Sequence, residues 1–226
     1  MSTNANTKQL LDDFKKGLSK AWFESGLDKR KSHSLFELYI FKLVLEAAQN
    51  HNAHIAYKDG NGSRHSVPTF GIGPHTIYNR KYIHAELQYG SRRILEVHIG
   101  AQFKGKSDVE HECDVAVLRK GTANLCRKRN QAPKYSQLIL SAECKFYTAN
   151  IGLGMSREFV GLTTDLTAPR KHNFYVVSST IVASGKQLLN HHSKMAQDEV
   201  VPSFLHKCDE LVRLFEQVLD PSRIWR

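Results

Sequence analysis

The segment Leu138-Ile-Leu-Ser-Ala-Glu-Cys-Lys145 joins a run of branched apolar residues to a carboxylate and an amine. The apolar run predicts a buried strand, within an extended segment expected over 136–147. Because side chains two apart in a strand point to the same face, Glu143 and Lys145 should project together and Cys144 should point away from them. An acid and an amine at the end of a buried strand are costly unless each has a partner. This segment therefore predicts both a core strand and a chemically active edge.

A second acidic residue opens the strand that comes before this one. Asp114 precedes a short apolar run in a strand expected over 109–118, and a further strand is expected over 93–99. A glycine-containing turn between these two strands predicts a hairpin. If the strands of Asp114 and Glu143 also pair, the two carboxylates lie close together on one face. Two carboxylates held this close repel each other, which favours a divalent cation between them.

The cation expected there is magnesium or manganese, because carboxylate oxygens are hard ligands that favour these ions over zinc. Such an ion polarises a phosphate and lowers the pKa of a bound water. Lys145 would orient or deprotonate that water and would offset the negative charge that develops. Cys113 and Cys144 neighbour the acids in sequence and are expected to be small core residues rather than nucleophiles.

Three further acids lie near this pattern. Glu37 follows a serine by three residues at the start of a helix expected over 34–50, so we interpret it as a capping-box residue rather than a ligand. Glu46, later in the same helix, is expected to point inward and assist as a metal ligand. The alternative for Glu46 is a solvated ion pair with Lys42. Glu112 is interpreted as part of an acidic strand edge, with a second metal ligand as the alternative.

An Asp at the start of one strand, Glu-x-Lys at the end of the next and an acid on the helix before them resemble the PD-(D/E)xK nuclease superfamily, which has the restriction-endonuclease-like fold. The resemblance rests on Asp114 and on Glu143-Cys144-Lys145, and it covers about residues 33–180. Cys113 stands where the family often has a proline. The resemblance implies an α/β fold with a mixed central β-sheet flanked by helices, in the core order αβββαβ. It also implies magnesium- or manganese-dependent hydrolysis of phosphodiester bonds in DNA. The residues that it places at the active site are Asp114, Glu143, Lys145 and Glu46, all but the lysine as metal ligands.

The whole chain of 226 residues is expected to form one nuclease domain. A helical extension over 1–32 precedes the core over 33–180, and helices over 181–226 follow it. The amphipathic helices of the two extensions would either form a dimer interface or pack on their own core. The remaining expected elements are helices at 8–25, 153–165, 182–196 and 203–219, and a strand at 173–179.

The chain is basic, with 32 Lys and Arg against 22 Asp and Glu and a net charge of +10. Six of the basic residues fall in a loop expected over 119–135, between the strands of Asp114 and Glu143. Because phosphate contacts supply affinity without sequence information, this loop is expected to bind nucleic acid, with a merely solvated loop as the alternative. The six are Arg119, Lys120, Arg127, Lys128, Arg129 and Lys134.

No apolar run approaches the roughly 18 residues of a membrane span, and the first residues lack the apolar core of a signal peptide, so no membrane partner is expected. With few cysteines and no C-x-x-C pair, a reducing cytoplasm is the expected location. Cutting both strands of a DNA duplex needs two sites, so a homodimer is expected, and family habit suggests a restriction or anti-phage role. The alternatives are a catalytically inactive nucleic-acid-binding module and a junction-resolving or repair nuclease. The sequence leaves the choice between DNA and RNA open.

Overall fold

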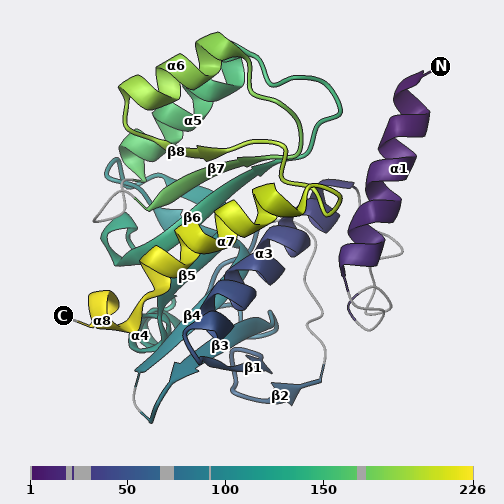
Figure 1. Cartoon of the computed structure of the whole chain (residues 1–226). Coiled ribbons are helices and arrows are strands. Elements are labelled where there is room, and N and C mark those ends of the chain that lie inside the picture. Colours follow the sequence, from purple (N-terminus) through teal and green to yellow (C-terminus); the bar gives the residue numbers. More distant parts are fainter. Residues whose placement is uncertain are drawn as a thin grey trace.

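The computed structural model describes residues 2–18, 22, 32–66, 74–91, 93–166 and 172–225. Its strands are β1 (His54–Lys58), β2 (Arg64–His65), β3 (His84–Tyr89), β4 (Arg93–Lys104), β5 (Glu110–Arg119), β6 (Leu138–Lys145), β7 (Asn173–Val177) and β8 (Met195–Gln197). They form one eight-stranded sheet in the spatial order β2-β1-β3-β4-β5-β6-β7-β8 (Figure 1). Both edges of this sheet are short, since β2 has two residues and β8 has three.

Two groups of helices flank the sheet (Figure 1). One group packs with the large core that Phe36, Val176 and Phe215 share, and the other packs with the cluster of Phe159 and Tyr175. Because Tyr175 and Val176 are adjacent in a strand, these two cores lie on opposite faces. The first group is α1 (Ser2–Gly17), α3 (Ser32–Asn50) and α7 (Leu205–Leu219), and the second is α5 (Leu153–Asp165) and α6 (Ala183–His191).

The sheet is mixed, as expected. All neighbours from β2 to β6 pair antiparallel, whereas β6 pairs with β7 and β7 with β8 in parallel. Parallel neighbours need a crossover connection, and α5 and α6 supply the two crossovers. The α/β class with a mixed sheet flanked by helices is therefore confirmed.

Helix α3 is buried at nearly every position from Leu35 to Ala48. A helix that is apolar all round must be covered on all sides. The sheet covers one side of α3, while α7 and α1 pack against others. This central helix therefore runs through the core, and its two acidic residues, Glu37 and Glu46, are only partly buried.

Most of the predicted elements are present with small changes in their bounds. The helices expected at 34–50, 153–165 and 203–219 correspond to α3, α5 and α7. The helix expected at 182–196 ends earlier, as α6, and the chain then continues into β8. The helix expected at 8–25 corresponds in part to α1, which ends at Gly17. Residues 19–21 and 23–25 of that prediction lie outside the described residues.

The loop predicted over 119–135 is wrong, because most of it is helix. Helix α4 (Lys120–Arg129) follows β5 directly, and Tyr135–Gln137 form a short 3₁₀ turn before β6. Asn130, with a left-handed φ of 50°, ends α4 in the way that asparagine and glycine commonly end helices. The short helix α8 (Pro221–Ile224) closes the chain's described part. Within that part, no helix is both long and apolar enough to cross a lipid bilayer.

Candidate active site

The backbone changes course where β4 passes Asp114 of β5. In the register of the two strands, Gly100 stands opposite Asp114. Gly100 has a φ of 66°, in the left-handed region that glycine adopts without steric penalty. Val115 packs into the large core around α3, whereas Cys113, two residues away, packs into a separate apolar cluster. The two strands therefore change the face that they present to the large core at this point, although their register is the same on both sides of it.

The Asp114 side chain connects β5 to β6 where the backbone pairing of these two strands ends. The regular pairing of the two strands reaches Val115 and Ala142 and goes no further. Asp114 Oδ2 instead accepts a hydrogen bond of 2.7 Å from the backbone N–H of Cys144. The carboxylate thus bridges the two strands as they diverge and lies against the end of β6.

Glu143 and Lys145 project together from the end of β6, as strand alternation predicts. The Lys145 Nζ donates a 2.6 Å hydrogen bond to Glu143 Oε1. The two side chains are 27% and 17% exposed for Lys145 and Glu143, so the ion pair is partly desolvated but open to solvent. Burial alone would lower the pKa of Lys145, but the charge and hydrogen bond of Glu143 raise it above its usual value. The lysine is therefore held as an ammonium in this state.

The Asp114 carboxyl group lies near other negatively charged side chains. Burial, and then the charges of Glu143 and Glu37, raise the pKa of Asp114 well above its usual range. The Cys144 N–H and the Lys145 ammonium act in the opposite direction. A carboxyl group in such a position needs either a proton or a nearby cation to offset the repulsion.

Glu37, rather than Glu46, is the helix residue that approaches this group. Both residues lie on α3, but nine positions separate them, which corresponds to about 13.5 Å along the axis and half a turn around it. Glu46 lines a surface cavity with Trp22 and Tyr57. The structure therefore does not bring Glu46 to the predicted site. The capping-box pattern pointed away from Glu37, which follows a serine that lies inside α3 rather than at its first residue.

Glu112 is the fourth carboxylate near this position. Its side chain is exposed on β5, and burial together with the charge of Glu143 raises its pKa, while Lys145 lowers it. Glu143 and Asp114 thus act on the Lys145 ammonium, while Glu37 acts on Asp114 and Glu112 interacts with both Glu143 and Lys145. Such a set of oxygen donors fits a hard divalent cation such as magnesium or manganese, and it does not fit the softer ions that favour sulfur and imidazole. Cys113 and Cys144 are both buried, and burial raises the pKa of each thiol, so neither is poised as a nucleophile.

The six basic residues between β5 and β6 divide into two sets. Three make contacts within the protein: Arg119 donates to the Ile224 carbonyl at 2.6 Å, Lys120 pairs with Glu86 at 2.6 Å, and Arg127 is buried. The other three, Lys128, Arg129 and Lys134, are exposed. The sequence could not separate the two sets, because all six follow one another in a polar stretch.

Arg127 of α4 belongs to a buried charged cluster with side chains of β3 and β4. Its guanidinium forms a two-pronged hydrogen bond to Glu96, at 2.9 Å to Oε1 and 2.5 Å to Oε2. His98 Nε2 lies 3.0 Å from Oε2 and His84 Nε2 lies 3.5 Å from Oε1. Burial lowers the pKa of His84 to about 3 and also lowers the pKa of His98, so both rings are neutral. The cluster thus holds one carboxylate against one guanidinium.

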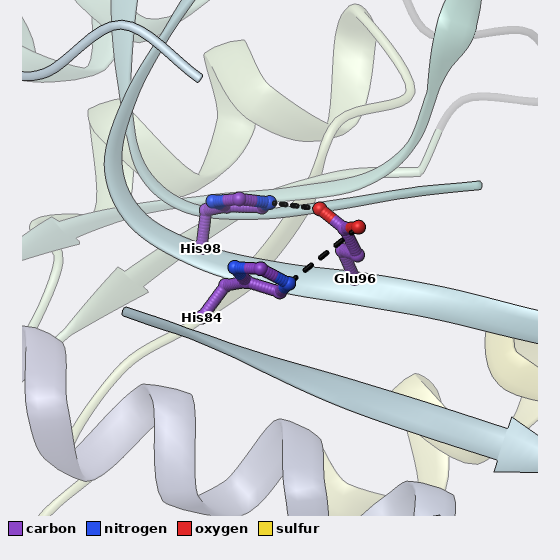
Figure 2. A group of neighbouring side chains, drawn as sticks. All are labelled: His84, Glu96 and His98. Carbon is purple, nitrogen blue, oxygen red and sulfur yellow. Dashed lines mark hydrogen bonds and ion pairs between the residues drawn. The ribbon is translucent and has the colours of Figure 1, made fainter. Parts of the chain in front are cut away.

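The same cluster has the residue types of a metal site, but its geometry is unfavourable for one. The ligand atoms of His84, Glu96 and His98 lie within 4.8 Å of one another. The two imidazoles stack with centroids 4.9 Å apart and planes at 20°, and Figure 2 shows each ring directed at its own carboxylate oxygen. In stacked imidazoles the nitrogen lone pairs point in parallel directions rather than toward one shared metal position. In addition, the Arg127 guanidinium already neutralises the Glu96 carboxylate. We therefore interpret the cluster as a buried ion pair that fastens α4 to the sheet.

The comparisons with known proteins found no match: no protein-family model fits the sequence, and neither a curated protein nor a solved structure is significantly similar to it. A function must therefore be inferred from the side chains that the fold brings together.

Proposed function

We propose that this protein is a metal-dependent nuclease of the PD-(D/E)xK type. The observation that carries the proposal is the convergence of Asp114 and Glu143, from adjacent strands, beside the ammonium of Lys145. With β1, β2, β3 and α4 left out as insertions, the order α3, β4, β5, β6, α5, β7 supports it, because it matches the αβββαβ order of that superfamily's core. The acid on the first helix of this core is Glu37.

The residues of the site divide the work in the proposed reaction. Asp114, Glu143 and Glu37 would hold a divalent cation, and Glu112, whose charge interacts with that of Glu143, would add a further oxygen. The bound ion supplies Lewis acidity toward the phosphate and activates water for attack. Lys145, kept as an ammonium by Glu143, offsets the negative charge that grows on the phosphate. The Cys144 N–H fixes Asp114 in place, so the ligand does not have to be ordered when the ion arrives.

The proposed substrate is DNA, which the exposed charges of Lys128, Arg129 and Lys134 would contact through its phosphates. These residues belong to the connection between β5 and β6, the two strands that carry the candidate ligands. A duplex cut on both strands needs two such sites, so we propose a homodimer as the acting form. A restriction or anti-phage role is the biological setting that we propose.

The first test is cleavage. Circular duplex, linear duplex, single-stranded DNA and RNA should each be incubated with magnesium, manganese or a chelator. We expect DNA cleavage that the chelator abolishes, and Asp114→Asn and Lys145→Met should each reduce it by at least about 100-fold. Cleavage at the parental rate by both variants would refute the site, and cleavage that persists in chelator would refute the metal requirement.

The second test uses the two acids of α3 as a matched pair. Glu37→Gln should weaken cleavage strongly, because it removes a charge beside Asp114. Glu46→Gln, on the same helix but two and a half turns away and on its opposite side, should leave cleavage unchanged. The reverse result would restore Glu46 to the site and remove Glu37 from it.

A further inference from the structure

Tyr175 is a fully buried residue whose hydroxyl group has no hydrogen-bond partner in the described part of the chain. It lies in the middle of β7, next to β6 in the sheet (Figure 1). The parallel register sets Tyr175 beside Glu143 and sets Val177 beside Lys145. Its ring stacks on Phe159 of α5, with centroids 4.7 Å apart and planes at 24°. The ring is therefore fixed, and its hydroxyl lies on the face of the sheet from which Glu143 and Lys145 project.

An unpaired buried hydroxyl is unfavourable for folding, so its position needs an explanation. Burial raises the pKa of Tyr175; the positive charge of Lys145 lowers this pKa, and the negative charge of Glu143 raises it. Tyr175 is in turn one of the groups that raise the pKa of Lys145. The hydroxyl is thus within electrostatic reach of both members of the ion pair, although it bonds to neither.

We propose that Tyr175 is a positioning residue of the candidate site, whose hydroxyl accepts a hydrogen bond from the Lys145 ammonium when Glu143 turns toward a divalent cation. The inference rests on the proposed nuclease function. An ammonium has three donors, and Lys145 gives one of them to Glu143 Oε1. A carboxylate that binds a cation offers less of its lone-pair density to the lysine. The Tyr175 hydroxyl, on the same face of the sheet, then replaces it as the acceptor. The ammonium stays in place for the phosphate instead of swinging into solvent.

A matched control exists in the same sheet. Tyr89 of β3 is also buried, and its hydroxyl likewise lacks a partner among the residues that the structure describes. Its ring packs edge-on against Trp225, at a centroid distance of 5.5 Å, away from the acidic group. Tyr175→Phe and Tyr89→Phe therefore make the same chemical change, and only the first removes a hydroxyl beside the candidate site.

The experiment measures manganese binding to the full-length protein by calorimetry without DNA, and then kcat and KM for DNA cleavage. Tyr175→Phe should weaken manganese binding about tenfold, which corresponds to about 1.4 kcal/mol. It should lower kcat and leave both KM and the melting temperature unchanged. Tyr89→Phe should change none of these quantities. In a Lys145→Met background, Tyr175→Phe should have no further effect on manganese binding, because the donor is gone.

Three results would count against this role. Parental affinity and kcat in Tyr175→Phe would overturn it, and so would additive losses in the double variant. A lowered melting temperature with unchanged manganese affinity would make the hydroxyl structural. If the parental protein neither binds manganese nor cuts DNA, the proposed function fails and this inference fails with it. If the parental protein does both and Tyr175→Phe matches it, only the inference fails.

Discussion

At the scale of single residues, Asp165 ties the end of α5 to the turn between β4 and β5. Its carboxylate accepts hydrogen bonds from the Ser107 hydroxyl at 2.6 Å and from the Ser107 N–H at 2.8 Å. His111 Nε2 lies 2.7 Å from the same carboxylate. The side-chain hydrogen bonds of Ser107 and then His111 lower the pKa of Asp165 to about 2. One carboxylate therefore anchors a hairpin that precedes Asp114 by only a few residues.

This anchor predicts a pH-dependent stability. The folded pKa of Asp165, about 2, is below its ordinary value of 3.8, so ionised Asp165 stabilises the fold above about pH 4. That stabilisation is lost as the pH falls through about 2. Asp165→Asn should therefore melt at a lower temperature than the parental protein at about pH 6, and the difference should narrow only below about pH 4, toward about pH 2. Thermal melts followed by circular dichroism test this, with Glu110→Gln on the same hairpin as the control. A difference that stays constant across the range would contradict it.

Residue-level prediction from the sequence succeeds where the pattern is local. The alternation of a strand is sufficient to set Glu143 and Lys145 on one side of β6. The choice between Glu37 and Glu46 is not local, because α3 is apolar nearly all round and no stripe marks the side that faces β5 and β6. Nothing in the sequence indicated that Tyr175 would lie beside Glu143, since this depends on the register between β6 and β7.

At the scale of elements, the ion pair between Arg127 and Glu96 holds α4 on the sheet. The buried side of α4 consists of Ala123, Cys126 and Arg127. An arginine in this stripe conceals the helical periodicity, which explains why the sequence suggested a loop. Its partner Glu96 lies on β4, 31 residues earlier, and no short-range pattern links the two.

Breaking this pair should destabilise the protein strongly. Arg127→Met leaves the Glu96 carboxylate buried and uncompensated, and Glu96→Gln leaves the guanidinium in the same state. Each change should cost about 3–5 kcal/mol of unfolding free energy, measured by urea denaturation. The double variant Glu96→Gln, Arg127→Met should cost less than the sum of the two, because no buried charge is left alone.

A second measurement separates the ion pair from a metal site. Zinc added to the parental protein should not raise its melting temperature, because Arg127 already occupies the Glu96 carboxylate. A zinc-dependent increase that His98→Ala abolishes would show instead that the cluster binds metal.

At the scale of the whole molecule, the exposed basic residues near α4 determine how DNA would be held. Lys128→Gln, Arg129→Gln and Lys134→Gln together should weaken DNA binding and lower the salt slope of log K by up to about 2.7, if each contacts one phosphate. Fluorescence anisotropy over a series of salt concentrations measures both quantities.

The control for this prediction removes equal charge elsewhere. Lys8, Lys15 and Lys16 are exposed on α1, which lies across the molecule from α4 (Figure 1). Changing these three to Gln should affect binding much less. Equal losses in both triple variants would mean that net charge alone, rather than the region around α4, attracts the nucleic acid.

The two edge strands of the sheet, β2 and β8, limit how two copies of the chain can associate. Strand-to-strand joining between proteins needs a run of free backbone N–H and C=O groups along an outer strand. Here the outermost strands have two and three residues, so neither of these two strands can offer such joining over more than a short step. A twofold complex would accordingly have to be recognised through side chains on helices and loops, and its affinity should respond to surface substitutions rather than to backbone register. The same brevity should protect the folded protein from fibrous self-association.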